Sequence, residues 1–412
     1  MKNIRIDGDR LWQSLMEMAK IGATEKGGNC RLAASDLDRD GRDLFVGWCK
    51  EAGCEVTVDA MGNIFARRAG RNPDLPPVMA GSHLDTQPTG GRFDGVLGVL
   101  AALEVVRTLN DHDAETEAPV EVCVWTNEEG SRFSPAMMGS GVFAGVFDLS
   151  DIHATTDEDG ASLGSELERI GYAGPEPVGG RDVGAYFELH IEQGPILEAE
   201  EKTIGVVTAA QGQRWHEITV TGQESHAGPT PMPRRKDALV AASKIVAEVN
   251  RIGHVHPPYA CATVGSMQVS PNSRNVIPGS VFLTVDLRHP VNETLSDMDA
   301  ELKTFCADTA KDMGVDIDVE DFWHFPPTPF QEDCVAAVRE GAELHGYEHM
   351  EIVSGAGHDA VYMAGVAPTG MIFIPCEDGI SHNEIENATL EDCAAGCNVL
   401  LHAVLQQART AP

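Results

Sequence analysis

Residues 76–109 read PPVMAGSHLDTQPTGGRFDGVLGVLAALEVVRTL, and this stretch decides the fold. Its first part is an apolar run that ends in the polar residues His83 and Asp85, a pattern typical of a buried strand with chemistry at its carboxyl end. Its second part opens at Asp94 and continues as an apolar helix. A strand followed by a helix is the repeating unit of a parallel sheet covered by helices.

The same pattern recurs along the chain. PVEVCVWTN reads as a buried strand that ends on the pair Glu128-Glu129, and AYFELH reads as another strand that ends on His190. After residue 326 the alternation resumes with a helix over 332–345, the strand GMIFIP, the block SHNE at 381–384 and a closing helix near 389–407. We therefore expect an α/β domain with a mostly parallel sheet covered on both faces.

The character of the chain changes between residues 214 and 325. Strand-like and helical segments follow there in the order β-α-β-β-α, which predicts a compact α+β unit with antiparallel strands. The sequence thus predicts a catalytic metal-binding domain, residues 1–213 and 326–412, interrupted by a smaller α+β domain, residues 214–325.

Composition excludes several classes of protein. Lys and Arg total 30 against 64 Asp and Glu, a formal charge of −34, so a nucleic-acid partner or an anionic membrane surface is not expected. The acidity is interpreted as a solvated surface. No two of the ten cysteines form a CxxC pair, and the first residues carry charges where a signal peptide would be apolar. We expect reduced thiols, a cytoplasmic location and no membrane segment.

Side chains that bind divalent metals or move protons stand at the ends of the predicted strands or in Gly-rich turns. Each histidine alone is more often an ordinary surface or core residue. Adjacent carboxylates at a buried strand end, however, are costly unless cations neutralise them. Together these residues predict two divalent ions, with Asp94 bridging, Glu128 acting on metal-activated water, and Asp85 orienting His83. The five predicted ligands are His83, Asp94, Glu129, His190 and His382.

The chain resembles the amidase branch of the dinuclear-zinc M20-type peptidases, which contains N-carbamoyl-L-amino-acid hydrolases, β-ureidopropionases and allantoate amidohydrolases. The resemblance covers nearly the whole chain. It rests on these blocks in order: GSHLDTQPTGGRFDGVLGVL, WTNEEGSRFSPAMMGS, ELHIEQGP, SHAGPTPM, NVIPG, DLRH and SHNE.

The resemblance implies the same ligands and Glu128 as general base. It further implies that Gln193 faces the substrate, that His226 in the smaller domain stabilises the oxyanion in the partner's active site, and that the smaller domain forms a homodimer. Asn275 and Arg288 would grip a substrate carboxylate, which suits the planar fork of a guanidinium; for Arg288 the alternative is an ion pair with Asp286. The GAGHD stretch, with Gly357 and His358, is expected to line the site.

The predicted reaction is hydrolysis of the ureido C–N bond of an N-carbamoyl-L-amino acid or N-carbamoyl-β-alanine, giving the amino acid, carbon dioxide and ammonia. Allantoate hydrolysis, an aminoacylase or dipeptidase activity, and a non-hydrolytic metal-binding relative stay open as alternatives. Mixed nitrogen and oxygen ligands accept several first-row metals, so zinc is expected first, with manganese, cobalt or nickel as alternatives.

Overall fold

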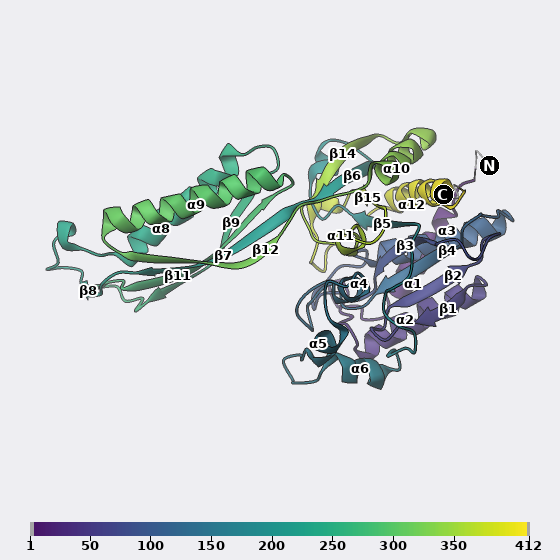
Figure 1. Cartoon of the computed structure of the whole chain (residues 1–412), viewed down its shortest axis with the longest axis horizontal. Coiled ribbons are helices and arrows are strands. Elements are labelled where there is room, and N and C mark those ends of the chain that lie inside the picture. Colours follow the sequence, from purple (N-terminus) through teal and green to yellow (C-terminus); the bar gives the residue numbers. More distant parts are fainter. Residues whose placement is uncertain (1–3, 410–412) are drawn as a thin grey trace. The chain divides into compact units, whose positions relative to one another are not determined.

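The computed structural model describes residues 4–409. It divides the chain into a larger unit, residues 1–208 and 329–412, and a smaller unit, Ala209–Thr328 (Figure 1). The junctions fall within a few residues of those expected from the change in sequence character. Each unit is described by itself below.

The larger unit is built on a nine-stranded sheet with the order β1-β2-β4-β3-β5-β15-β6-β13, and β14 pairs with β6. The four central strands β4, β3, β5 and β15 run parallel to one another, whereas β1 pairs antiparallel with β2, β2 with β4, and β6 with β15. Every residue of the four central strands is buried, so both faces of the sheet are covered, as expected for a parallel core. The strands are β1 (Glu55–Val58), β2 (Ile64–Arg68), β3 (Val78–His83), β4 (Val120–Trp125), β5 (Ala185–Ile191), β6 (Ile204–Ala210), β13 (Thr328–Pro329), β14 (His349–Ser354) and β15 (Thr369–Ile374).

Helices cover this sheet. The apolar helix α3 packs on β3, and α12 contacts α3, β5 and β15 (Figure 1). The helices of the larger unit are α1 (Gly8–Met18), α2 (Asp36–Glu51), α3 (Val96–Asp111), α4 (Met138–Phe143), α5 (Leu149–Ala154), α6 (Leu163–Ile170), α7 (Ile196–Ala199), α10 (Glu332–His345), α11 (Asp359–Met363) and α12 (Leu390–Arg409), with a short 3₁₀ turn η2 (Glu377–Gly379).

The parallel strands position the candidate site. His83 ends β3, His190 lies near the end of β5, and Glu128 and Glu129 follow β4 after a short turn. Because β4, β3 and β5 are parallel neighbours, their carboxyl ends share one edge of the sheet. The α/β fold expected from the sequence is confirmed, with the polar residues at this edge.

The smaller unit is an antiparallel sheet with the order β12-β7-β11-β9, covered by two helices that pack together. The expected order β-α-β-β-α is present, but the sequence did not predict β12, whose acidic residues alternate with apolar ones along an edge strand. The elements are β7 (Gly212–Thr221), β8 (Ser225–His226), η1 (Met232–Arg234), α8 (Ala238–Val255), β9 (Cys261–Ser270), β10 (Val276–Ile277), β11 (Ser280–His289), α9 (Asn292–Met313) and β12 (Asp316–Phe325).

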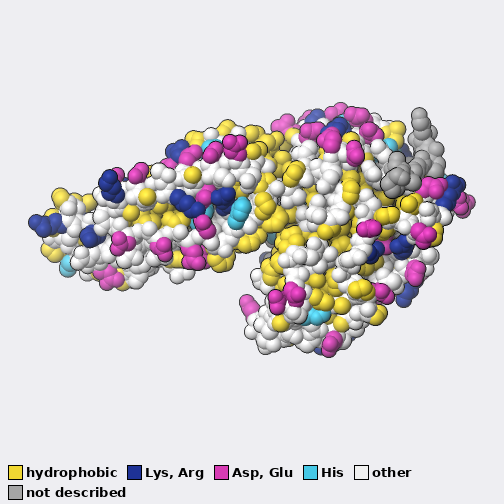
Figure 2. Space-filling view, viewed as in Figure 1, with side chains coloured by type: hydrophobic (Ala, Val, Ile, Leu, Met, Phe, Trp, Pro, Cys, Tyr) yellow, Lys and Arg dark blue, Asp and Glu magenta, His cyan; other side chains and the backbone are white. Residues whose placement is uncertain are grey.

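Three bulk properties can be compared with the sequence. Acidic side chains are scattered over the visible face of both units and do not gather in one patch (Figure 2). All ten cysteines are free, and eight of them are buried. Within residues 4–409 no helix combines the length and the apolar character that a membrane span requires.

Candidate metal centre

The predicted ligands of the larger unit lie together around Asp94. Three overlapping groups each have ligand atoms within 4.8 Å of one another. The first group holds His83, Asp94 and His190; the second holds His83, Glu128 and Glu129; the third holds Asp94, Glu129 and His382. Most of these residues are buried, whereas the side chain of His382 is 59% exposed. Segments separated by three hundred positions therefore converge on one carboxylate.

The two oxygens of Asp94 face different histidines. Oδ1 lies 3.1 Å from Nε2 of His190 and 3.6 Å from Nε2 of His83. Oδ2 lies 3.5 Å from Nε2 of His382, and that nitrogen is 3.9 Å from Glu129. A carboxylate placed in this way can bind one cation through each oxygen, which is the geometry of a bridging ligand.

Backbone carbonyls fix the tautomers of the two buried histidines. Nδ1 of His83 lies 2.9 Å from the carbonyl oxygen of Asp85, and Nδ1 of His190 lies 2.9 Å from that of Ile191. A carbonyl oxygen only accepts, so each Nδ1 carries the hydrogen. In the neutral imidazoles the lone pairs are therefore on Nε2, which lies near Asp94 in both residues and in His190 also accepts the amide of Gly95 at 3.1 Å. A metal ion would bind these lone pairs.

The electrostatics of the cluster favour bound cations. Burial raises the pKa of Glu128 and of Glu129 well above the usual range, and neighbouring carboxylates add to the effect. For Asp94 burial acts in the same direction, but His190 and His83 hold its pKa well below the usual range. Burial lowers the pKa of His83, yet Glu128 and Asp94 outweigh it and raise the pKa. The cluster therefore attracts positive charge, as protons or as metal ions.

Asp85 differs from its predicted role. Its carboxylate Oδ1 is 4.0 Å from His83 Nδ1, and the backbone carbonyl takes the bond that was expected for the side chain. The two carboxylate oxygens instead accept the backbone amides of Glu128 at 3.3 Å and Glu129 at 3.2 Å. Asp85 thus connects the end of β3 with the turn that follows β4.

The structure explains why the residue after Asp94, Gly95, is a glycine. Its φ is +68°, and a Cβ built there would lie 2.4 Å from the imidazole of His83. Only glycine fits without displacing that ring. Gly95 precedes the first residue of α3, Val96, so the helix begins slightly later than the sequence suggested, and Asp94 stands before it.

Gln193 and His358 also lie at the cluster. The Gln193 amide donates to Asp94 Oδ2 at 2.9 Å, and Gln193 has a left-handed backbone with φ +59°. The buried His358 ring is 4.6 Å from that of His190, and among the described residues its Nε2 has no hydrogen-bond partner. Gly357 precedes it, close to Met137. These positions are compatible with the predicted contacts to a substrate.

The remaining predicted residues belong to the smaller unit. His226 in β8 pairs with Val276 in β10, and the amide of Ala227 donates to the carbonyl of Asn275, so His226 and Asn275 are close neighbours. His226 Nδ1 accepts the amide of Gly228 at 3.0 Å, which leaves the hydrogen of a neutral ring on Nε2.

Arg288 lies near the end of β11, away from the β8–β10 ladder in the topology. It forms an ion pair of 2.8 Å with Asp286, the alternative that the sequence had left open.

Sequence reasoning missed several polar residues that contact the predicted ligands, among them Gln87, Ser381 and Glu386. Gln87 donates a short hydrogen bond to Glu129. Glu386 accepts the backbone amide of Asp94 at 3.1 Å and is buried. Gln87 lies in HLDTQPTGG together with His83, and Glu386 lies in SHNEIEN together with His382. The acid four residues after His382 was the available signal for Glu386.

A second acidic group with a histidine lies in the smaller unit. Ligand atoms of His216, Asp299 and Asp321 also fall within 4.8 Å of one another. The ammonium group of Lys303 lies 3.0 Å from Asp299 and 2.8 Å from Asp321. Because a lysine already supplies the positive charge, this group is an ion-pair network.

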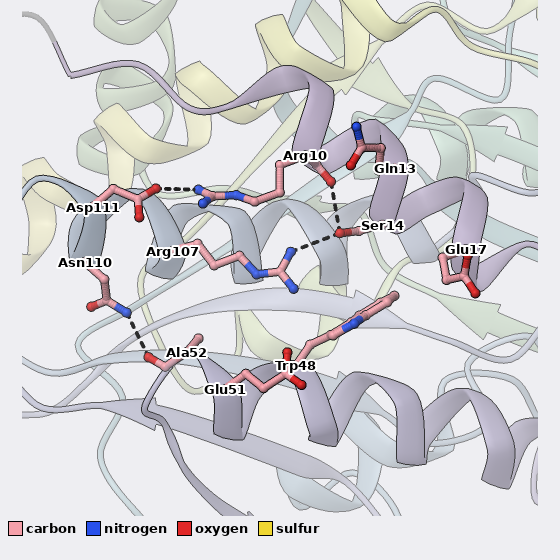
Figure 3. Close-up of a pocket in the computed structure, with 10 residues that line it drawn as sticks. All are labelled: Arg10, Gln13, Ser14, Glu17, Trp48, Glu51, Ala52, Arg107, Asn110 and Asp111. Atoms are coloured by element: carbon pink, nitrogen blue, oxygen red, sulfur yellow. Dashed lines mark hydrogen bonds and ion pairs between the residues drawn. The ribbon is translucent and has the colours of Figure 1, made fainter.

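A surface pocket of about 520 Å³ lies between α1, α2 and α3 (Figure 3). Arg10 is paired there with Asp111 at 2.8 Å, and Arg107 donates to the Ser14 hydroxyl at 2.9 Å. None of the lining residues belongs to the cluster at Asp94, so the pocket is separate from the candidate centre.

Comparison with known proteins identifies relatives along the whole chain. An N-carbamoyl-L-amino-acid amidohydrolase of Rhizobium meliloti is 53% identical over 407 residues, which covers 99% of this chain and 98% of the relative. An allantoate amidohydrolase of Escherichia coli (strain K12) is 34% identical over 96% of this chain and 97% of its own. The crystal structure of an amidase of the hydantoinase/carbamoylase family from Burkholderia multivorans superposes with a TM-score of 0.97 at 65% identity, covering 99% of this chain and all of that one.

The family comparison agrees with these relatives. Residues 79–406 match the family described as Peptidase family M20/M25/M40. The match begins inside β3 and ends inside α12, so it spans the predicted ligands and the smaller unit. Together with the relatives it confirms the resemblance noted in the sequence and the prediction of a hydrolase. The chain is a member of peptidase family M20/M25/M40, within its amidohydrolase branch.

Proposed function

We propose that this protein hydrolyses N-carbamoyl-L-amino acids with two divalent metal ions bound at the Asp94 cluster. The observation that carries the proposal is the placement of the two Asp94 oxygens, one toward His83 and His190 and the other toward His382. The name of the Rhizobium meliloti relative gives the substrate class.

The residues present suit two ions. One would be held by His83, His190 and Asp94, and the other by Asp94, Glu129 and His382. When bound, such ions lower the pKa of water and polarise a carbonyl group. Nitrogen and oxygen donors of this kind suit zinc, and they also accept manganese, cobalt or nickel.

Glu128 moves the proton in this proposal. Its carboxylate lies 3.4 Å from His83 and is buried, and its raised pKa suits a group that takes a proton and later returns it. Water adds to the carbamoyl carbon, Glu128 accepts the proton of that water, and it returns the proton to the nitrogen of the leaving amino acid as the C–N bond breaks. The carbamic acid released then decomposes to carbon dioxide and ammonia.

The smaller unit supplies substrate contacts in the proposal. The Nε2–H of His226 is a donor suited to a developing oxyanion. Arg288 and Asn275 would bind the carboxylate of the substrate, Arg288 with two parallel hydrogen bonds. The substrate would thus be a small ureido or amide compound that carries a carboxylate.

We infer a homodimer in which His226 serves the site of the partner subunit. β9 is an edge strand of ten residues with most side chains exposed, and such an edge is suited to pairing with another chain. On β7 and β12, Trp215, Phe322 and Trp323 form an exposed aromatic group. Both features support an interface in the smaller unit.

Allantoate hydrolysis is the second candidate. It rests on the Escherichia coli relative, whose identity of 34% is below the 53% of the N-carbamoyl-L-amino-acid amidohydrolase. N-carbamoyl-β-alanine, an acylamino acid or dipeptide substrate, and a non-hydrolytic role are further outcomes of the test below. The retained Glu128 and the assembled cluster favour a hydrolase.

The cytoplasmic location stays a prediction. All ten cysteines are free, which is compatible with a reducing compartment.

A substrate panel tests the proposed function. Purified protein loaded in turn with zinc, manganese, cobalt or nickel would be given the L and D forms of N-carbamoyl-methionine, N-carbamoyl-β-alanine, allantoate and N-acetyl-L-methionine. We expect the fastest release of amino acid from N-carbamoyl-L-methionine and a loss of at least about 100-fold in kcat for Glu128→Gln. Faster hydrolysis of allantoate would favour the second candidate, and no hydrolysis of any compound would contradict the enzyme proposal.

Mixed dimers test the shared site. Glu128→Gln and His226→Ala should each be inactive alone. After unfolding and refolding together they should regain activity, because a mixed dimer has one site with an intact Glu128 and an intact His226 from the other subunit. Absence of recovery in a mixture shown to contain mixed dimers would contradict the sharing of His226.

A further inference from the structure

Glu386 is a buried carboxylate that holds the backbone of the predicted bridging ligand. Its Oε1 accepts the backbone amide of Phe93 at 3.0 Å and that of Asp94 at 3.1 Å. Only 1% of the residue is exposed. We propose that Glu386 is a positioning residue that sets the orientation of Asp94 between the two metal ions, an inference that rests on the metal centre proposed above.

The Glu386 carboxylate is tightly packed against its neighbours. A Cβ built on Gly91 would lie 2.0 Å from Oε1 and 2.5 Å from Oε2 of Glu386. The carboxylate therefore lies directly against the main chain of the GGRFD segment, where no side chain larger than hydrogen fits. A buried carboxyl group this close to a backbone is stabilised by the hydrogen bonds that it accepts from the two amides.

Ser381 links Glu386 to the side chain of Asp94 as well. Its hydroxyl lies 3.2 Å from Asp94 Oδ2 and 3.2 Å from Glu386 Oε2. A hydroxyl has one hydrogen, so it can donate to only one of the two carboxylates at a time. The hydroxyl also accepts the Gln193 amide at 3.3 Å. When cations take the oxygens of Asp94, the hydrogen of Ser381 is free to point to Glu386, the acid that holds the backbone.

The arrangement also connects two distant predicted ligands. Glu386 lies four residues after His382, and its amide donates to Asn383, so the turn that carries His382 is tied to the segment that carries Asp94. Asp94, whose backbone amide Glu386 accepts, is also the residue whose Oδ2 faces His382. Displacing Glu386 should therefore disturb both ion positions that share Asp94.

A second link between the same segments provides a matched control. Arg92 donates to Asn387 at 2.9 Å, so Asn387→Ala removes a contact between these segments without touching the amide of Asp94. A purely structural role for Glu386 would make the two variants alike. The positioning role predicts that they differ in metal binding.

The test measures cobalt and zinc binding by the full-length protein, at a temperature where every variant is folded. Glu386→Ala should bind zinc about 10- to 100-fold more weakly than wild type and show an altered cobalt absorption spectrum, with a lower kcat and a nearly unchanged KM. Glu386→Gln keeps an oxygen for the two amides and should recover most of the affinity, to within about fivefold of wild type. Asn387→Ala should keep the wild-type spectrum and affinity.

Two outcomes separate this inference from the proposed function. If wild type binds two ions and hydrolyses its substrate while Glu386→Ala keeps the wild-type affinity and spectrum, the positioning role is wrong and the function stands. If wild type itself binds no pair of ions, the metal centre is wrong. Should Glu386→Ala not fold, Glu386→Asp decides: its side chain is one methylene shorter, so it should weaken zinc binding, and wild-type binding would overturn the inference.

Discussion

The backbone carbonyl of Asp85 lies 2.9 Å from Nδ1 of His83, whereas the Asp85 carboxylate lies 4.0 Å from that nitrogen. The main chain of Asp85 therefore fixes the His83 tautomer. Its side chain is left to accept the amides of Glu128 and Glu129. Asp85 thus orders His83, a predicted ligand at the end of β3, and Glu128, the proposed general base that follows β4.

Asp85→Ala should lower activity because Glu128 and Glu129 are no longer held in place, and it should leave the His83 tautomer unchanged. The two buried amides lose their acceptor, so we expect a cost of about 1–3 kcal/mol in unfolding free energy and a decrease in kcat of about 10- to 100-fold. Asp85→Asn keeps one acceptor oxygen, so its kcat and its unfolding free energy should lie between those of Asp85→Ala and wild type. Steady-state kinetics and urea unfolding measure both effects, and a variant of an exposed aspartate, Asp74→Ala, serves as control. A wild-type kcat in Asp85→Ala would contradict the proposal that Asp85 orders Glu128 and Glu129.

Glu166 should make stability depend on pH in the acid range. Hydrogen bonds from Arg169, together with Arg132, lower its pKa to about 2 against an ordinary value of 4.5. The folded pKa lies below the unfolded one, so the contribution is fully present above pH 4.5 and is lost as the pH falls toward 2.

Glu166→Gln should therefore destabilise the protein at pH 7 by about 1–3 kcal/mol, a range kept small because Arg169 is partly exposed to solvent. The difference from wild type should narrow below pH 4.5. Urea unfolding at pH 7, 4 and 3 measures it. A difference that stays constant over this range would show that the loss does not come from the charge.

The arrangement of the larger unit could be predicted because parallel strands place their polar ends at one edge. His83 and His190 end apolar runs, and Glu128 follows one, so local patterns located them on that edge. The smaller unit was only partly predictable. In β12 acidic and apolar residues alternate, as in a half-buried strand, but Asp and Glu are uncommon in strands and hid this signal.

Details of the site depend on tertiary contacts that no local pattern contains. The exchange of roles between the carbonyl and the carboxylate of Asp85 follows from how the turn after β4 meets the end of β3. Glu386 is nearly three hundred residues from Asp94 in the chain, and its importance appears only when the two segments are brought together.

Removal of metal should destabilise the protein. Asp94, Glu128 and Glu129 are close together and mostly buried, so the folded state gains from cations that neutralise them. At a free zinc concentration 100 times the dissociation constant, one site adds about 2.7 kcal/mol to the unfolding free energy. Calorimetry with chelator and then with zinc added back should show a reversible rise in Tm. An unchanged Tm would argue against metal binding to the folded state.

Arg288→Lys should raise KM far more than it lowers kcat. Lysine keeps the positive charge but lacks the planar fork that binds a carboxylate with two hydrogen bonds, so we expect an increase of about 10-fold or more in KM for N-carbamoyl-L-methionine. Arg339→Lys serves as control, because Arg339 pairs with Glu351 and is not part of the proposed site. An unchanged KM would contradict the binding of the substrate carboxylate by Arg288.

Anomalous diffraction at the zinc edge, from crystals of the zinc-loaded protein, tests the central claim most directly. The account predicts two peaks about 3.5–4 Å apart, one bonded to His83, His190 and Asp94 and the other to Asp94, Glu129 and His382. A single peak, or peaks remote from Asp94, would contradict it.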